Sequence, residues 1–232
     1  MSDFQPTGVL YIVATPIGNR DDISVRAIET LKNADIVLCE ERKIGSKLLK
    51  QLGLEKPLQE LNEHNESAMI QDVLVELMNG KNLALISDCG TPVFSDPGKQ
   101  LIRLLYEMQL KVVPIPGASA LMTAISVCPI NLDRFFFLGF LPAKADQRQR
   151  SLKHLSGLDY PFVLMDTPYR LTKSLQEIEA LLGKKQNIFL AMDMTLPTER
   201  FLGGTVAEVL QQVQGRKAEF ILIVDRPQRR RL

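Results

Sequence analysis

Short aliphatic and β-branched runs alternate along the chain with longer segments whose apolar residues recur every three or four positions. In the first half, apolar runs predict buried strands at residues 9–14, 36–39, 83–86 and 112–115, with a weaker strand at 58–61. Helical periodicity predicts helices at residues 24–33, 42–52, 66–79 and 97–108. Five strands joined by helical crossovers predict a parallel sheet that is covered on both faces.

The second half begins after Pro116 and Gly117 and continues the alternation. Strands are expected at 135–138, 162–165, 188–192 and 220–224, and helices at 119–127 and 171–182. Thr205 and Glu208 have the spacing of a capping box and predict a further short helix, whereas residues 144–154 form a charged stretch. The pattern therefore predicts an α/β protein of two halves, with a parallel-sheet domain at 1–116 and a mixed-sheet domain at 117–232.

Composition narrows the class of protein without naming a ligand. The chain carries 28 basic and 27 acidic residues, so contact with nucleic acid has to come from local patches. The three cysteines, Cys39, Cys89 and Cys128, form no CxxC pair, which predicts free thiols. Because the chain also has only two histidines, no metal site is expected. The sequence starts without a signal-peptide pattern, and no apolar run approaches the ~20 residues of a membrane helix. We expect a cytoplasmic protein.

Three loops rich in glycine and proline follow predicted strands one, four and five. They are residues 15–19, 87–98 and 114–119. Parallel sheets bind ligands beyond the carboxyl ends of their strands, where such loops lie together. One loop of this kind is more often a simple turn, but three on one edge favour a ligand cleft.

The residues alone leave the ligand open. Neither the dinucleotide fingerprint GxGxxG nor the phosphate loop GxxxxGK[ST] is present. Asp88 follows a strand and could bind hydroxyl groups or an amine, or it could cap its own turn. The residues alone therefore indicate a nucleotide-like ligand that is bound without a phosphate-binding loop.

Four strings resemble the ribosomal RNA small-subunit methyltransferase I family of the tetrapyrrole-methylase superfamily. They are LYIVATPIGNRDDIS, LISDCGTPVFSDPG, VVPIPGASA and FFFLGFLPA, and the resemblance runs from about Leu10 to Asp225. It implies two αβα domains, a homodimer, and S-adenosylmethionine in the cleft between the domains. It also implies methylation of a ribose 2′-hydroxyl of small-subunit rRNA.

The resemblance also implies which residues contact the cofactor. In the first half these are Pro16, Ile17, Gly18, Asp88, Gly90, Thr91, Pro92, Pro116, Gly117 and Ser119. Further contacts are expected from Ala120, Met165, Ala218 and Glu219. Transfer of a methyl group needs alignment of the reactants in a dry cleft and requires no metal.

Departures from the family's pattern fall outside the cofactor strings. The chain has Arg42-Lys43 where the family has Thr-Arg, and Met192 and Leu196 replace two basic residues. Lysine keeps the charge of arginine but lacks its bidentate fork. The sequence therefore constrains the identity of the substrate less than that of the cofactor.

Candidate catalytic residues are Glu40, Glu41 and Lys43, which follow strand two on the ligand edge. A general base or a nearby cation would help to deprotonate a hydroxyl group. The competing interpretation is a solvated helix start, where acidic residues are favoured anyway. His64 and Cys89 are expected to be ordinary loop residues.

Two basic clusters could hold an RNA backbone if both flank the same cleft. The first is Lys43, Lys47 and Lys50, and the second is Lys144, Arg148, Arg150 and Lys153. Two alternatives to an rRNA methyltransferase stay open at this point. One is a methylase of a small tetrapyrrole-like molecule, and the other is a cofactor-binding paralogue that has lost catalysis.

Overall fold

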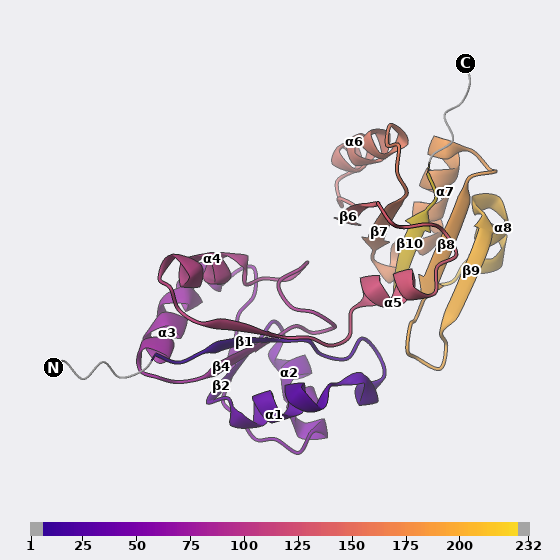
Figure 1. Cartoon of the computed structure of the whole chain (residues 1–232). Coiled ribbons are helices and arrows are strands. Elements are labelled where there is room, and N and C mark those ends of the chain that lie inside the picture. The colour runs from indigo at the N-terminus through magenta and orange to yellow at the C-terminus, as the bar shows by residue number, and fades with distance from the viewer. Residues whose placement is uncertain (1–6, 227–232) are drawn as a thin grey trace. The chain divides into compact units, whose positions relative to one another are not determined.

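The first half of the chain is built on a five-stranded parallel sheet with the strand order β3-β2-β4-β1-β5 (Figure 1). The computed structural model describes residues 7–226, so the basic residues Arg229–Arg231 lie outside it. The strands are β1 (Leu10–Val13), β2 (Ile36–Cys39), β3 (Leu58–Glu60), β4 (Leu83–Ile86) and β5 (Val112–Ile115). All five strands predicted from the apolar runs are confirmed, the weak third strand included.

Helices cover both faces of this sheet because successive strand residues point to opposite sides. Leu83 and Leu85 join the core beneath α3 (Glu66–Met78) and α4 (Lys99–Glu107). Ala84 and Ile86 join the core beneath α1 (Val25–Asn33) and α2 (Arg42–Gln51). Figure 1 shows α3 and α4 on one side of the sheet and α1 and α2 on the other. A short 3-10 helix, η1 (Arg20–Asp22), precedes α1.

The helix α4 begins at Lys99 and not at residue 97 as the periodicity predicted. Gly98 has a φ of 115°, which lies in the left-handed region and cannot continue into a right-handed helix. Pro97 and Gly98, which end the preceding loop, therefore also set the start of the helix.

The second compact unit begins at Ala120, where the sequence placed the boundary between residues 116 and 117. Its sheet has the order β6-β7-β10-β8-β9, with β6 and β7 parallel and the other pairs antiparallel. The strands are β6 (Phe136–Phe140), β7 (Phe162–Asp166), β8 (Asn187–Met192), β9 (Arg200–Thr205) and β10 (Phe220–Val224).

The helices of this unit are α5 (Ala120–Ser126), α6 (Ala145–Ser156), α7 (Leu171–Leu182) and α8 (Val206–Val213), with the 3-10 helix η2 (Pro168–Arg170) before α7. Buried side chains of α6, α7 and α8 pack on one face of the sheet in a single core. The predicted capping box is confirmed, because the Thr205 side chain accepts from the Glu208 backbone N–H while Glu208 accepts from that of Thr205.

Two elements of this unit were not predicted. The stretch at 144–154, described only as charged, contains most of α6, which buries Arg148, Leu152 and Leu155 on one face. The strand β9 was missed because its sequence, RFLGGT, contains two glycines and no long apolar run. Among residues 7–226, no helix combines the length and apolar character needed to cross a membrane.

Candidate functional site

The loops that follow β1 and β4 are tied together at the carboxyl edge of the first sheet. The backbone N–H of Thr15 donates to the carbonyl oxygen of Gly90 (2.8 Å), and its hydroxyl donates to that of Ser87 (3.2 Å). The Ser87 hydroxyl also donates to Gly90 (3.1 Å). Buried Thr15 and Ser87 were not among the predicted site residues, although their positions at strand ends were a signal for this role.

Close packing against neighbouring side chains explains two glycines of these loops. Gly90 has a φ of 81°, and a Cβ there would lie 3.2 Å from Cγ2 of Ile17. A Cβ on Gly117 would lie 3.0 Å from Cβ of Ala14. The glycines therefore allow the loops to pack on one another, which a larger residue would resist.

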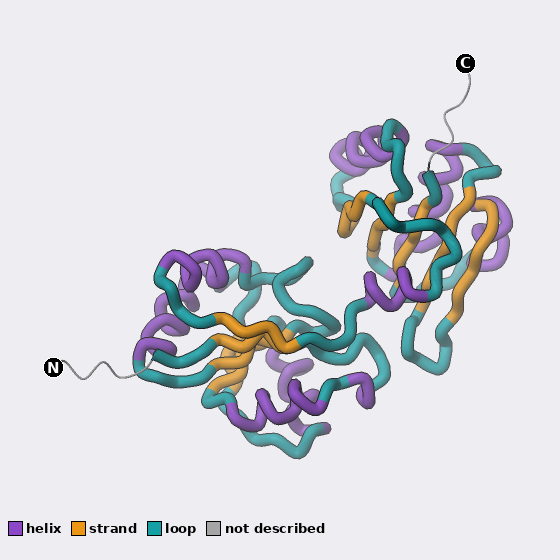
Figure 2. Tube along the Cα trace, in the orientation of Figure 1, coloured by secondary structure: helices purple, strands orange, loops and turns teal. Residues whose placement is uncertain are grey.

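The loop after β5 joins the other two, because the Thr91 hydroxyl donates to the carbonyl oxygen of Ala118 (3.1 Å). We call residues 15–19, 87–98 and 116–119 the edge loops; Figure 2 shows them in teal beyond the strands of the first unit. They contain the predicted cofactor residues Pro16, Ile17, Gly18, Asp88, Gly90, Thr91, Pro92, Pro116, Gly117 and Ser119. The structure brings these loops together, and their contact with a cofactor stays a prediction.

Three half-buried carboxyl groups lie at the same edge. They belong to Glu40 after β2 and to Asp88 and Asp96 in the second edge loop. Burial raises the pKa of all three, and the charges of Asp96 and Asp88 raise the pKa of Glu40 further. The site is thus rich in negative charge that water stabilises poorly. The sequence did not predict Asp96 as a site residue.

The other two predicted catalytic residues lie in the open. Glu41 is exposed at the N-cap of α2, and its backbone N–H donates to Oδ1 of Asp88 (3.1 Å). Lys43 is exposed in the first turn of the same helix, as are Lys47 and Lys50 further along it. Among residues 7–226, no group of three or more His, Cys, Asp or Glu side chains is arranged to hold a metal ion.

A carboxylate from α3 fixes the end of the second edge loop. Oε1 of buried Glu66 accepts hydrogen bonds from the backbone N–H groups of Gly98 (3.1 Å), Gln100 (3.0 Å) and Leu101 (3.4 Å). These N–H groups belong to the first turn of α4, which has no side-chain cap of its own. His64 lies exposed in the turn before α3.

The remaining predicted cofactor residues belong to the second unit. Met165 lies on β7 and pairs with Ile221 of β10. The carbonyl oxygen of Glu219 accepts from the backbone N–H of Asp193 (2.9 Å), and the backbone N–H of Glu219 donates to Oδ1 of Asp193 (3.1 Å). Ala218 is buried before β10. Partial burial and the charge of Asp193 raise the pKa of Glu219. Ala120 begins α5. Their role toward a cofactor stays a prediction.

Arg148, which the sequence placed in an RNA-binding cluster, is instead 2% exposed within a buried ionic network. Its Nη1 lies 2.7 Å from Oδ2 of Asp166, and its Nε donates to Oε2 of Glu177 (2.7 Å). The Ser174 hydroxyl accepts from Arg148 (3.0 Å) and donates to Asp166 (2.8 Å). We call these four residues the ionic network. Arg150 pairs with Asp146 at the surface, so the second basic cluster is not the free cationic patch that was expected.

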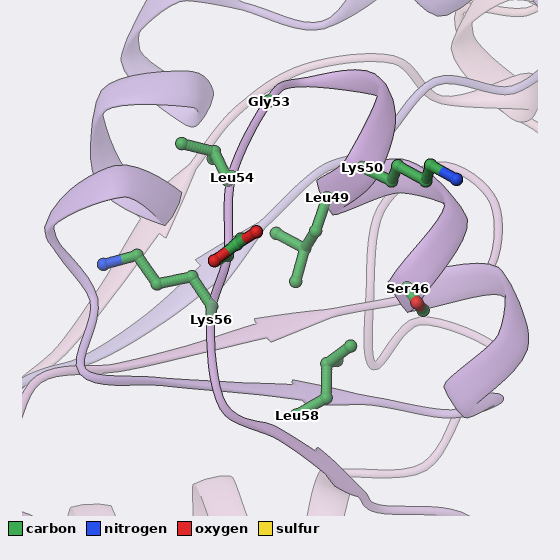
Figure 3. Close-up of a pocket in the computed structure, with 8 residues that line it drawn as sticks. Ser46, Leu49, Lys50, Gly53, Leu54, Lys56 and Leu58 are labelled. Carbon is green, nitrogen blue, oxygen red and sulfur yellow. The ribbon is translucent and has the colours of Figure 1, made fainter.

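A cavity of about 490 Å³ lies away from the edge loops, beside the amino end of β3 (Figure 3). Leu49, Leu54 and Leu58 form its apolar part. The other lining residues are Ser46, Lys50, Gly53, Glu55 and Lys56. Lys56 is engaged, since its Nζ donates to the carbonyl oxygen of Ala34 (2.9 Å). Of the residues that line this cavity, Lys50 belongs to the first basic cluster, and none is a predicted catalytic or cofactor residue.

Comparison with known proteins gives the chain a family. Residues 9–210 match the family model described as Tetrapyrrole (Corrin/Porphyrin) Methylases. Ribosomal RNA small subunit methyltransferase I of Haemophilus influenzae is 40% identical over 94% of this chain and 79% of its own length. The protein of the same name from Escherichia coli O157:H7 is 39% identical over 94% and 78%.

Solved structures support the same fold. Uroporphyrin-III-C-methyltransferase from Thermus thermophilus matches with a TM-score of 0.63 and 17% identity, over 94% of each chain. A putative diphthine synthase from Entamoeba histolytica matches with a TM-score of 0.67 and 17% identity, over 95% of this chain and 93% of its own. This chain belongs to the tetrapyrrole methylase family and, within it, to the ribosomal RNA small subunit methyltransferase I family, and it is an S-adenosylmethionine-dependent methyltransferase.

Proposed function

We propose that this methyltransferase binds S-adenosylmethionine at the edge loops and methylates a ribose 2′-hydroxyl of small-subunit rRNA. The observation that carries the cofactor site is the joining of three glycine-containing loops beside half-buried carboxyl groups. The proposed rRNA substrate rests on relatives named ribosomal RNA small subunit methyltransferase I, which are up to 40% identical to this chain.

The residues at the edge loops suit a cationic cofactor. S-adenosylmethionine carries a sulfonium and an ammonium group, and Glu40, Asp88 and Asp96 supply negative charge where water is partly excluded. Gly90 lets the edge loops pack closely, because a Cβ there would press against the side chain of Ile17. When bound, the cofactor supplies an electrophilic methyl group. The edge loops hold it in one orientation and limit access of water.

Glu40 is the best candidate for a general base among the predicted catalytic residues. It is half-buried, and its raised pKa makes it a stronger base than an ordinary glutamate. Glu41 is exposed and serves the N-terminus of α2 through its backbone. We therefore assign Glu40 to proton removal from the acceptor hydroxyl and leave Glu41 as a helix-start residue.

The lysines of α2 are the proposed contacts to the RNA backbone. Lys43, Lys47 and Lys50 are exposed on one helix, and Lys43 is the one nearest to Glu40 in the sequence. A chain of net charge +1 needs such a local patch to attract phosphates. We further propose contributions to cofactor binding from Ala120, Met165, Ala218 and Glu219, together with a homodimer, as the family resemblance implies. We also propose a cytoplasmic location.

Calorimetric titration with S-adenosylmethionine tests the separation of the cofactor and RNA sites. Asp88→Ala removes a charged acceptor from the edge loops, and we expect the Kd to rise roughly 10- to 150-fold. Lys43→Ala, on exposed α2, is the matched control and is expected to leave the Kd unchanged. The reverse pattern, with Lys43→Ala weakening binding and Asp88→Ala sparing it, would show that the two sites have been exchanged.

A further inference from the structure

Tyr169 lies in the 3-10 helix η2, directly after β7, and is 77% exposed. An exposed aromatic residue is common at protein surfaces and needs no special explanation by itself. Two features of Tyr169 are informative: its turn is firmly held, and a lysine side chain lies over its ring.

The turn that carries Tyr169 is fixed on both sides by the buried carboxylate of Asp166. Oδ1 of Asp166 accepts from the backbone N–H of Thr167 (2.9 Å) and lies 3.7 Å from Nη1 of Arg170. Oδ2 of the same carboxylate belongs to the ionic network, and Pro168 restricts the backbone further. A ring presented from so rigid a turn loses little conformational entropy when a ligand stacks on it.

A lysine lies over one face of this ring. Nζ of Lys217 lies 4.8 Å from the centroid of the Tyr169 ring, within the range of a cation–π contact. Lys217 is exposed. Ala218 and Glu219 separate it from Phe220, the first residue of β10. Because Phe220 pairs with Asp166 in the sheet, the start of β10 and the end of β7 lie at the same edge.

We propose that Tyr169 and Lys217 form a binding site for one unpaired nucleobase of the RNA substrate. The face of the Tyr169 ring opposite Lys217 provides the stacking surface, and the Lys217 ammonium group contacts an adjacent phosphate. An aromatic face next to a cation suits single-stranded RNA, which offers both a π-face and a negative charge at every nucleotide. The inference rests on the proposed function for its substrate class, and it adds a substrate contact that lies in the second unit.

Tyrosine fluorescence tests the stacking directly, since the chain contains four tyrosines and no tryptophan. Replacing Tyr11, Tyr106 and Tyr160 by phenylalanine leaves Tyr169 as the sole emitter. We expect a short single-stranded RNA to quench this emission in a saturable way, and Lys217→Ala to weaken the binding. A blunt RNA duplex, whose bases are stacked within the helix, is expected to quench little. Absence of quenching by single-stranded RNA would overturn the inference.

Methyl-transfer kinetics on undermethylated small ribosomal subunits provide the second measurement. Tyr169→Ala is expected to raise the KM for subunits by about five- to 150-fold, the range of one lost base–aromatic stack. The Kd for S-adenosylmethionine and the melting temperature should not change. Tyr169→Phe should restore a KM close to that of the wild type, and Tyr106→Ala, at a similarly exposed tyrosine of α4, should have no effect.

The outcomes separate this inference from the function on which it rests. A wild-type enzyme that labels rRNA while Tyr169→Ala has an unchanged KM overturns the base-stacking site alone. A raised Kd of Tyr169→Ala for S-adenosylmethionine also overturns it, because the ring would then serve the cofactor. A wild-type enzyme that labels no rRNA overturns the proposed function itself.

Discussion

Glu66 shows how one buried side chain can determine the shape of an edge loop. Its carboxylate is supplied by α3, yet its three hydrogen-bond donors are backbone N–H groups at the start of α4. A negative charge at a helix N-terminus is favoured by the helix dipole as well as by the hydrogen bonds. Glu66 therefore anchors the end of the second edge loop without lying in it.

Replacing Glu66 by alanine should destabilise the protein by about 3 kcal/mol, since buried N–H groups would lose a charged acceptor. Urea denaturation followed by circular dichroism measures the change. Glu29→Ala is the control, because its ion pair with Lys32 is exposed and 3.9 Å long and should contribute little. A Glu66→Ala protein as stable as this control would mean that the three hydrogen bonds do not hold α4.

Replacing Asp96 should have the opposite effect on stability from replacing Glu66, because the negative charge of Asp96 is unfavourable in the folded state. Burial and the charge of Asp88 raise its pKa above the ordinary value of 3.8, so the folded protein binds this proton more tightly than the unfolded chain. The penalty is absent below pH 3.8 and grows as the pH rises through the raised pKa.

Asp96→Asn should therefore stabilise the protein at pH 7 and have little effect near pH 4. Thermal or urea unfolding of the two proteins at both pH values measures the difference. A variant less stable than the wild type at pH 7 would show that the carboxylate is stabilised by contacts that outweigh its desolvation.

At the scale of elements, the ionic network connects α6, β7 and α7 through charged groups inside the second core. Arg148 of α6 contacts Asp166 at the end of β7 and Glu177 of α7. Taking these charges out of water is costly, so the network is better understood as fixing the register of three elements than as a source of net stability. That register also fixes the turn that carries Tyr169.

Arg148→Ala should destabilise the protein by about 3–5 kcal/mol, because two carboxylates would be left without their buried partner. Arg150→Ala on the same helix removes only an exposed pair with Asp146, and its expected cost is at most about 0.5 kcal/mol. The comparison of the two variants by urea denaturation isolates the effect of burial. Equal losses would contradict the assignment of Arg148 to a structural network.

Periodicity was a good guide where burial repeats along the sequence and a poor one where partners are distant. Residues 220–224 are buried throughout and could be recognised as a strand from their aliphatic run alone. The strand β9 has an alternation interrupted by Gly203 and Gly204, so only its pairing with β8 identifies it. The role of Arg148 was equally hidden, because its partners Asp166 and Glu177 are supplied by other elements.

At the scale of the whole molecule, each unit has its own sheet and its own buried core. The edge loops could be predicted from glycine and proline after strand ends, because the topology of a parallel sheet brings those ends together. The raised pKa values of Glu40, Asp88 and Asp96 could not be predicted from the sequence, since they depend on burial and on distances between loops. The net charge of +1 excludes a general attraction to RNA and leaves binding to local groups such as the α2 lysines.

The most direct test of the account is transfer of a tritiated methyl group from S-adenosylmethionine to undermethylated small ribosomal subunits, followed by digestion of the rRNA to nucleosides. We expect label in the rRNA, recovered as a 2′-O-methylated nucleoside, and strong loss of labelling in Glu40→Gln. Label on a base would contradict the ribose assignment. Tight cofactor binding without any label in rRNA would contradict the central claim that this methyltransferase acts on the small ribosomal subunit.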